Sequence, residues 1–207
     1  MNNTVFIIDD DASVRDSLGL LLSLHGFRTL VFADGPGFLS ALRPHWRGCL
    51  IVDIRMPGMD GLTLQQELKQ RGCTIPVVIA TGHGDVSSAR AAFRADAVDF
   101  LEKPFDETRL LQAINEAYER QDSQLARQAQ HHAYNQRLNT LTPREREVLE
   151  QVVADRHNRE IAQALGISVR TVEVHKAHMM AKLGATTVPQ LIRMSLGADP
   201  GDTTSIR

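Results

Sequence analysis

Acidic side chains follow two of the short apolar runs in this chain. Asp9 and Asp10 come directly after the run Thr4–Ile8, and Asp53 ends the run that begins at Cys49. The carboxyl ends of parallel strands meet at one edge of a sheet, so these carboxylates are expected to lie close together. Clustered carboxylates repel one another unless a cation sits among them, and hard oxygen ligands suit Mg²⁺. The sequence therefore predicts a magnesium site at this edge.

A hydroxyl and an ammonium group are expected at the same edge. Thr81 ends a further apolar run, and Lys103 follows the last one. An ammonium group neutralises the charge of a phosphoryl group, and a hydroxyl donates a hydrogen bond to it. Aspartate is also a known nucleophile that forms an acyl phosphate. Together these residues predict that Asp53 carries a phosphoryl group beside a metal ion.

The elements that position these residues alternate between strand and helix. Five short apolar runs have the composition of buried strands, and a helical pattern of apolar residues follows each one. The predicted strands are Thr4–Ile8, Phe27–Val31, Cys49–Val52, Pro76–Ala80 and Val98–Leu101. The predicted helices are Ser13–His25, Gly35–Leu42, Leu62–Gln70, Val86–Ala95 and Glu107–Arg120. This alternation predicts an α/β domain over residues 1–120, a doubly wound five-stranded parallel sheet with strand order 2-1-3-4-5.

The rest of the chain changes character. Residues 121–139 are polar and rich in Gln, which fits either a solvated spacer or a helical linker that makes a dimer contact. Residues 140–197 are expected to form an all-α domain of four helices. Residues 198–207 are rich in Gly, Asp, Thr and Ser and are expected to be a disordered tail.

Helix start and stop signals divide the all-α domain. Thr142 opens a capping box with proline at the first helical position, Asn158 and Ser168 are expected to cap the next two helices, and a fourth is expected over Thr187–Ser195. The second and third helices flank a tight turn at Gly166. This spacing is typical of a helix-turn-helix, whose second helix enters the major groove of DNA.

Composition limits the class of protein to which this chain can belong. The 207 residues are 43% hydrophobic and 23% charged, as in ordinary soluble domains. No apolar run approaches the roughly 20 residues of a membrane span, and the N-terminus lacks a secretory pattern, which favours the cytoplasm. Cys49 and Cys73 are not spaced as a metal or redox pair. Residues 1–120 hold 12 Lys/Arg against 16 Asp/Glu, and residues 140–197 hold 8 against 6, which favours a nucleic-acid partner for the second part only.

The first 120 residues resemble the receiver domain of two-component response regulators. Four motifs carry the resemblance, in order and at the strand ends: IIDDD at 7–11, DIRMPGMDG at 53–61, ATG at 80–82 and FLEKPF at 100–105. Such a domain has the flavodoxin-like, CheY-like fold. The resemblance implies that Asp53 is the phosphoacceptor.

The resemblance also implies roles for the neighbouring residues. The Mg²⁺ ligands would be Asp10, Asp53 and the backbone carbonyl of Arg55, with Asp9 acting through water. Lys103 would bind the phosphoryl group, with a cis peptide bond before Pro104. The implied switch residues are Thr81 and Phe100, although a phenylalanine on a strand is also common as plain core. His83, at the rim of the site, has two interpretations, an exposed loop residue or one that tunes hydrolysis of the acyl phosphate.

The last part resembles the LuxR-type DNA-binding module. The motifs are LTPREREVL at 141–149, NREIAQALGIS at 158–168 and TVEVHKAHMMAKLG at 171–184. One departure is Asp155, where the family often has glycine. A receiver followed by this module resembles the NarL/FixJ family, and the wording TGHGDV at 81–86 favours its FixJ-like branch.

The position of each residue in the module predicts its DNA contacts. Base edges are expected to face Glu173, Val174 and Ala177. Phosphates are expected to bind the residues Thr171, Lys176, His178 and Lys182.

The resemblance implies a cytoplasmic transcription regulator and not an enzyme. A sensor histidine kinase would phosphorylate Asp53, a homodimer would form through the face at residues 86–118, and the dimer would bind double-stranded promoter DNA and contact RNA polymerase. The alternative is a phosphorylation-independent DNA-binding protein whose receiver is only a dimer interface. A dehalogenase-like phosphotransferase is disfavoured, because Arg55 stands where that class has a second acid. Occlusion of the recognition helix by the receiver and a loosely tethered arrangement both stay open.

Overall fold

The computed structural model describes residues 4–82 and 86–195. The predicted disordered tail at 198–207 and the two interpretations of His83 therefore lie outside the described residues. The chain divides at Gln124 and Leu125 into two compact units, and each is described by itself.

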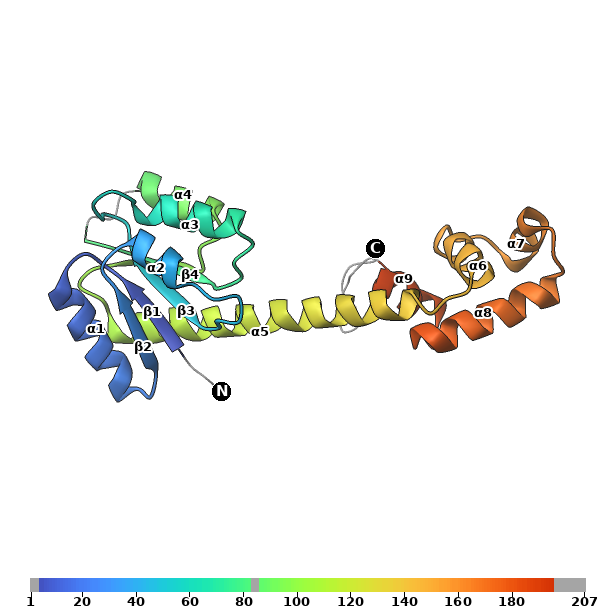
Figure 1. Cartoon of the computed structure of the whole chain (residues 1–207), viewed down its shortest axis with the longest axis horizontal. Coiled ribbons are helices and arrows are strands. Elements are labelled where there is room, and N and C mark those ends of the chain that lie inside the picture. The colour runs from blue at the N-terminus through green and yellow to red at the C-terminus, as the bar shows by residue number, and fades with distance from the viewer. Residues whose placement is uncertain (1–3, 83–85, 196–207) are drawn as a thin grey trace. The chain divides into compact units, whose positions relative to one another are not determined.

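The first unit is a parallel sheet covered by helices on both faces (Figure 1). The strand order is β2-β1-β3-β4-β5, and neighbouring strands pair in parallel. Its strands are β1 Thr4–Ile8, β2 Arg28–Phe32, β3 Cys49–Asp53, β4 Val77–Thr81 and β5 Asp99–Glu102. Its helices are α1 Ala12–Leu24, α2 Gly35–Ala41, α3 Gly61–Gln70, α4 Val86–Arg94 and the first part of α5 Glu107–Leu138. The predicted doubly wound fold is confirmed.

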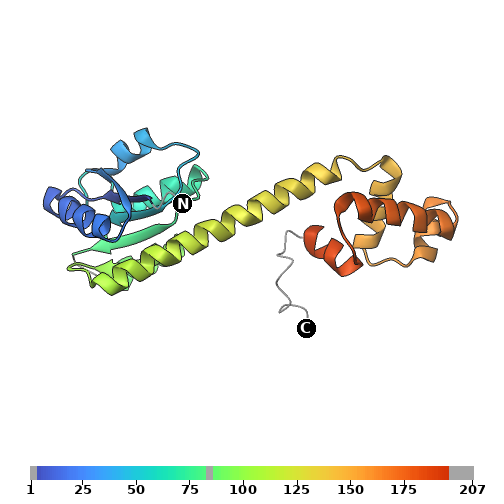
Figure 2. The same ribbon diagram turned by 90° about the horizontal axis from the view of Figure 1, so that it is seen from below.

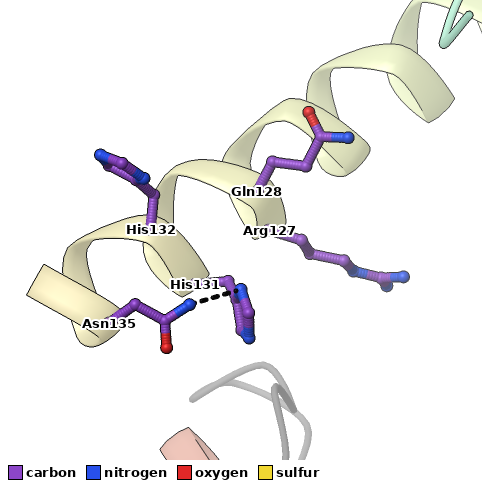
Figure 3. Close-up of a pocket in the computed structure, with 5 residues that line it drawn as sticks. All are labelled: Arg127, Gln128, His131, His132 and Asn135. Carbon is purple, nitrogen blue, oxygen red and sulfur yellow. Dashed lines mark hydrogen bonds between the residues drawn. The ribbon is translucent and has the colours of Figure 1, made fainter. Parts of the chain in front are cut away.

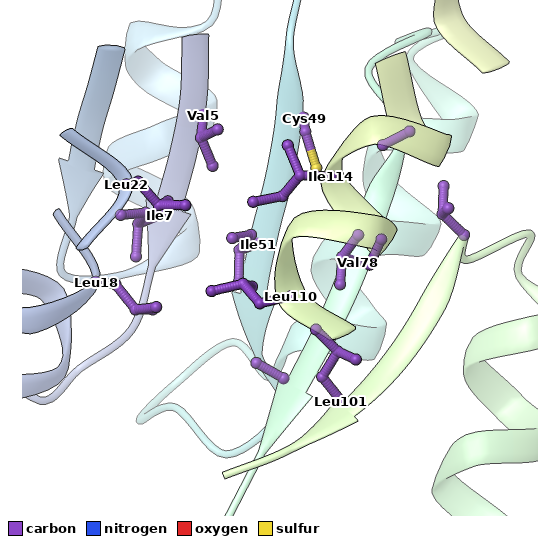
Figure 4. Packing of buried hydrophobic residues seen from close by; sticks show 14 residues of the cluster. Val5, Ile7, Leu18, Leu22, Cys49, Ile51, Val78, Leu101, Leu110 and Ile114 are labelled. Carbon is purple, nitrogen blue, oxygen red and sulfur yellow. The ribbon is translucent and has the colours of Figure 1, made fainter. Parts of the chain in front are cut away.

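Two apolar clusters, one on each face, hold this sheet. On one face, Ile51 and Val78 of the sheet contact Leu22 of α1 and Leu110 and Ile114 of α5 (Figure 4). The other face packs against α2, α3 and α4. Because β3 is buried along its whole length, its last residue, Asp53, is held at the carboxyl edge by apolar packing behind it.

Helix α5 is longer than the prediction of Glu107–Arg120 and ends at Leu138 (Figure 2). The predicted linker at 121–139 is therefore helical almost throughout. Its end also belongs to the second core, because Tyr134 is 6% exposed and Leu138 packs beside it. The predicted domain start at residue 140 stays a prediction, and two apolar residues before it, Tyr134 and Leu138, join this core. The polar composition of the segment conceals these two apolar positions.

The second unit consists of helices around one apolar cluster. Helices α6 Pro143–Val153, α7 Asn158–Leu165, α8 Val169–Leu183 and α9 Val188–Ser195 follow the end of α5. The cluster is centred on buried residues of these helices, among them Val148, Ile161, Val172, Met179, Leu183 and Leu191. The predicted helix-turn-helix is α7 and α8, joined at Gly166, which has a left-handed backbone.

Two local predictions have different outcomes. The capping box at Thr142 is confirmed, with the Glu145 amide donating to Thr142 Oγ1 at 3.3 Å and the Thr142 amide donating to Glu145 Oε2 at 2.8 Å. The prediction that Asn158 caps the next helix is wrong by one residue. His157 is the N-cap, and its amide donates to Glu160 Oε2 at 2.7 Å. Sequence reasoning favoured the better capping side chain, whereas the acid at the third helical position determines the register.

Candidate functional site

Lys103 joins two buried carboxylates at the carboxyl edge of the sheet. Its Nζ donates to Asp53 Oδ1 at 2.6 Å and to Asp9 Oδ2 at 2.5 Å. The side chains are 18%, 7% and 3% exposed, respectively. The strand ends of β1 and β3 and the turn after β5 thus meet as predicted, and the Lys103–Pro104 peptide bond is cis.

The electrostatics of this group are unbalanced. Burial raises the pKa of Asp53 above its ordinary value, and the hydrogen bond from Lys103 only partly opposes this shift. Burial would lower the pKa of Lys103, but its hydrogen bonds to Asp53 and Asp9 outweigh burial and raise it. Two carboxylates share one lysine, so Lys103 stays charged while the negative charge of Asp53 is only partly neutralised.

The backbone around Asp53 is held tightly. The Arg55 amide donates to Asp53 Oδ2 at 2.6 Å. The Gly61 amide donates to the Ile54 carbonyl at 3.0 Å, and a Cβ at position 61 would lie 2.3 Å from the Asp53 carbonyl oxygen. Only glycine fits at this approach, which explains the last residue of the motif DIRMPGMDG.

The loop after β1 contributes two further groups. Asp10 is exposed, whereas Asp9 is buried and accepts a hydrogen bond from the Asp11 amide at 3.0 Å. Arg15 was not predicted from the sequence, yet its Nη1 donates to the Asp9 carbonyl at 2.6 Å. The available signal was a cation on the predicted helix, four residues after the acidic run Asp9–Asp11.

The implied switch residues lie on neighbouring strands. Thr81 is 1% exposed at the end of β4, and its backbone carbonyl accepts from the Lys103 amide at 2.7 Å. Phe100 on β5 is half-buried, stands opposite Ile79 in the register and packs with the α2–α4 side of the core. Thr81 is therefore bonded to the turn that carries Lys103, and Phe100 packs against the core while staying partly exposed. This arrangement leaves their switching role a prediction.

The residues present fit a hard cation. Among the described residues, no cluster of three or more acids, histidines or cysteines converges as a ready-made ion cage. The donor chemistry nevertheless suits Mg²⁺, because Asp10 and Asp53 offer carboxylate oxygens and Arg55 offers a carbonyl. Burial destabilises the charged form of Asp53, and a nearby divalent cation would relieve that cost.

The second unit exposes one side of α8. Val172, Met179 and Leu183 face the core, whereas Val174 is 46% exposed. The other predicted contact residues that are exposed are Glu173, Ala177 and His178, and those that are half-buried are Thr171 and Lys176. Of these six predicted contact residues, four are thus exposed and two are half-buried.

Lys182, one of the predicted phosphate contacts, also pairs with a buried acid. Its Nζ donates to Glu145 Oε2 at 2.7 Å, and the Glu145 side chain is only 4% exposed. The Lys182 hydrogen bond, followed by that of the Thr142 amide, lowers the pKa of Glu145 from 4.5 to about 2. Lys182 therefore has a structural role as the partner of a buried acid, and its predicted phosphate contact stays a prediction. Nothing in the sequence marks Lys182, which is exposed, as the partner of a buried acid.

A receiver fold with a lysine-bridged phosphoacceptor candidate, followed by a helix-turn-helix, defines a class of two-component regulators. Two family models match the chain: the response regulator receiver domain over residues 5–115, and the bacterial regulatory proteins of the luxR family over residues 139–195. Neither model includes the stretch of α5 from 116 to 138.

Known proteins are similar over nearly the full length. The transcriptional regulatory protein FixJ of Bradyrhizobium diazoefficiens is 41% identical over 194 residues, which cover 94% of this chain and 95% of that protein. FixJ of Rhizobium meliloti is 42% identical over 198 residues, or 96% and 97% of the two chains. The chain belongs to the FixJ/NarL family of response regulators, with a receiver domain and a LuxR-type DNA-binding domain that regulates transcription.

Solved structures agree. The response regulator StyR has a TM-score of 0.77 at 37% identity, covering 95% of this chain and 99% of that one. Full-length FixJ from B. japonicum has a TM-score of 0.59 at 40% identity, covering 95% and 97%. None of the described helices combines the length and apolarity that a membrane span needs.

Proposed function

We propose that Asp53 accepts a phosphoryl group from a sensor histidine kinase in the cytoplasm. A carboxylate oxygen of Asp53 attacks phosphorus, an O–P bond forms as the N–P bond of the phosphohistidine breaks, and the departing imidazole takes a proton. The observation that carries this proposal is the Lys103 ammonium, 2.6 Å from Asp53 Oδ1, where it would neutralise the added charge.

Mg²⁺ is proposed to bind Asp10, Asp53 and the Arg55 carbonyl, with Asp9 acting through water. When bound, it would screen the negative charge that gathers on the phosphoryl oxygens. The protein's own contribution is positional. Lys103 bridges Asp53 and Asp9, and the Arg55 amide holds the second oxygen of Asp53, so both oxygens of that carboxylate are fixed in place.

The output is proposed to be a dimer that binds promoter DNA. A phosphoryl group on Asp53 attracts the Thr81 hydroxyl, Phe100 turns inward, and the face at residues 86–118 changes shape for a second copy. Helix α8 then presents Glu173, Val174 and Ala177 to base edges. Thr171, Lys176, His178 and Lys182 bind phosphates, and the bound dimer contacts RNA polymerase.

The test is phosphorylation by a small-molecule phosphodonor with Mg²⁺, followed by intact mass. Wild type and the control Asp122→Asn, an exposed acid on α5, should gain one phosphoryl group, and Asp53→Asn should gain none. Phosphorylation of Asp53→Asn to the wild-type extent would rule the assignment out.

Footprinting with and without beryllofluoride tests the output. Mg²⁺ and beryllofluoride mimic the acyl phosphate, so protection of a DNA site should strengthen when they are added. Identical footprints would instead support a receiver that acts only as a dimer interface.

A further inference from the structure

The last turn of α5 is built into the DNA-binding unit. Tyr134 is 6% exposed and Leu138 packs beside it, both in the cluster that also holds Val172 and Leu183 of α8. The family model for this unit begins only at residue 139. The structure thus adds a piece of the linker helix to the core on which the recognition helix rests.

The preceding stretch of α5 behaves differently. Side chains there point away from the helix, and His131 and Asn135 hydrogen bond to each other along it at 3.2 Å (Figure 3). Residues from Asp122 to His132 are exposed, apart from the half-buried Leu125. The packing of α5 against the second unit therefore begins at about Tyr134.

Arg137 reaches from this last turn to the end of α8. Its Nη1 donates to the carbonyl of Leu183 at 3.0 Å. Leu183 is the last residue of α8, and the final carbonyls of a helix have no partner within the helix. A cation there also interacts favourably with the helix dipole. Arg137 therefore supplies from another helix what the end of α8 lacks.

Gly184 makes room for this contact. It follows α8 with a left-handed backbone, φ +72°, and a Cβ at this position would lie 2.7 Å from Arg137 Nη1. The guanidinium thus lies directly against the backbone at the end of α8. A side chain at position 184 would displace it.

The backbone carbonyls at the end of α5 also accept hydrogen bonds from side chains that follow it. Arg146 Nη2 on α6 donates to the Leu138 carbonyl at 3.0 Å. Thr140 Oγ1 donates to the Arg137 carbonyl at 2.7 Å. The end of α5 is therefore tied to α6 and α8 together, and Arg137 is the residue through which it bonds to the recognition helix.

We infer that Arg137 is a positioning residue for DNA recognition, which fixes the end of the recognition helix α8 to the linker helix. Contacts between side chains and base edges tolerate errors of only about half an ångström, so a helix free to tilt at one end loses them. Phosphate contacts are less demanding in geometry and persist. This inference rests on the proposed role of α8 as the helix that reads bases.

The experiment uses the full chain with beryllofluoride and two duplexes of equal length, a site selected from random DNA by the wild-type protein and a random sequence. Dissociation constants are measured over a range of salt concentrations. Arg137→Met should weaken binding to the selected site by about tenfold, since it removes a charged hydrogen bond, and leave the random duplex unchanged. Arg137→Lys, which keeps a donor, should recover part of the loss. Arg144→Met removes an equal charge from α6 and should match wild type.

The salt dependence separates positioning from direct contact. A residue that binds phosphate contributes about 0.9 to the slope of log affinity against log salt concentration. Arg137→Met should keep the wild-type slope. A lower slope with equal losses on both duplexes would overturn the inference in favour of a phosphate contact, and so would unchanged affinity for the selected site.

Two variants cover the remaining outcomes. If Arg137→Met does not fold, Arg137→Gln, which retains an N–H donor, is measured in the same way. Its affinity for the selected site should lie between that of Arg137→Lys and a value tenfold below wild type. Glu173→Ala tests the foundation. Selected-site binding that survives Glu173→Ala and further changes at Val174 and Ala177 would refute the proposed role of α8. If those changes abolish specificity while the Arg137 variants match wild type, only the present inference fails.

Discussion

The two units each contain a lysine paired with a buried carboxylate, and the pairs differ in their balance of charge. In the receiver, Lys103 is shared by Asp9 and Asp53, and the pKa of Asp53 is raised, first by burial. In the DNA-binding unit, Lys182 bonds to Glu145, whose pKa falls to about 2, chiefly through that hydrogen bond. The Asp53 and Glu145 carboxylates are both nearly inaccessible to solvent.

The difference in charge balance fits the proposed reactive role of Asp53 and the structural role of Glu145. The Glu145 carboxylate accepts hydrogen bonds from the Lys182 ammonium and from the Thr142 amide, so its charged form is stabilised by the fold. Asp53 shares Lys103 with Asp9, so its negative charge is only partly neutralised. A metal ion bound beside Asp53 would complete the neutralisation. The same residue types thus stabilise the second unit and leave Asp53 of the first incompletely neutralised, as the proposed phosphoryl transfer requires.

Breaking the satisfied pair should have the largest effect. Lys182→Met removes the charged hydrogen bond to the buried Glu145 carboxylate, and because solvent partly screens this pair we expect the second unit to lose about 2 kcal/mol of stability. Helical circular dichroism should report this loss. The single tryptophan, Trp46, stacks on Phe6 at 4.7 Å in the receiver, and its fluorescence should follow the wild-type curve.

A double variant checks the cause of that loss. Adding Glu145→Gln to Lys182→Met removes the unpaired charge and should restore part of the stability. Lys176→Met, a lysine on the same helix outside this pair, serves as the control. Equal unfolding of Lys182→Met and the control would contradict the structural role.

Acid should weaken the second unit through Glu145. Its folded pKa, about 2, lies below the ordinary 4.5, so its stabilising contribution is complete above pH 4.5 and is lost as pH falls towards 2. Glu145→Gln should cost about 1–2 kcal/mol at neutral pH and remove this part of the acid dependence. Denaturation curves followed by circular dichroism between pH 6 and pH 2 would show it. A variant with the full wild-type acid dependence would assign that dependence to other carboxylates.

The corresponding change in the receiver should have the opposite sign. Since the folded pKa of Asp53 is raised, its charged form costs stability above that pKa, and the cost disappears as pH falls through it. Asp53→Asn removes one of two acids that share Lys103 and should stabilise the receiver by about 1 kcal/mol, in line with the usual cost of active sites. Urea unfolding monitored by Trp46 fluorescence measures it. A destabilised Asp53→Asn receiver would show that Lys103 satisfies both acids fully.

The sequence predicted the receiver site better than the DNA-binding unit, for a physical reason. Asp9, Asp53, Thr81 and Lys103 lie at strand ends, where the topology of a parallel sheet alone brings them together. The partners of Lys182 and Arg137 depend on how helices pack, and no period or spacing encodes which buried acid or helix end a long side chain reaches. The contact of Arg15 and the start of α7 were also not predicted, because each depends on which local group a side chain hydrogen bonds to.

The smallest predicted effect compares one aspartate from each unit. Asp96 and Asp155 both follow helices with left-handed backbones, φ 75° and 56°, which glycine adopts without steric cost. Asp96 forms an ion pair with Arg120 at 3.6 Å, whereas Asp155 has no such partner among the described residues. Asp155→Gly should therefore stabilise the second unit by about 0.5 kcal/mol, after the greater freedom of glycine in the unfolded chain is subtracted. Asp96→Gly should gain less, because it also loses its pair, and the two midpoints in urea decide the order. A larger gain at position 96 would mean that the Arg120 pair contributes nothing and that backbone strain is greater in the receiver.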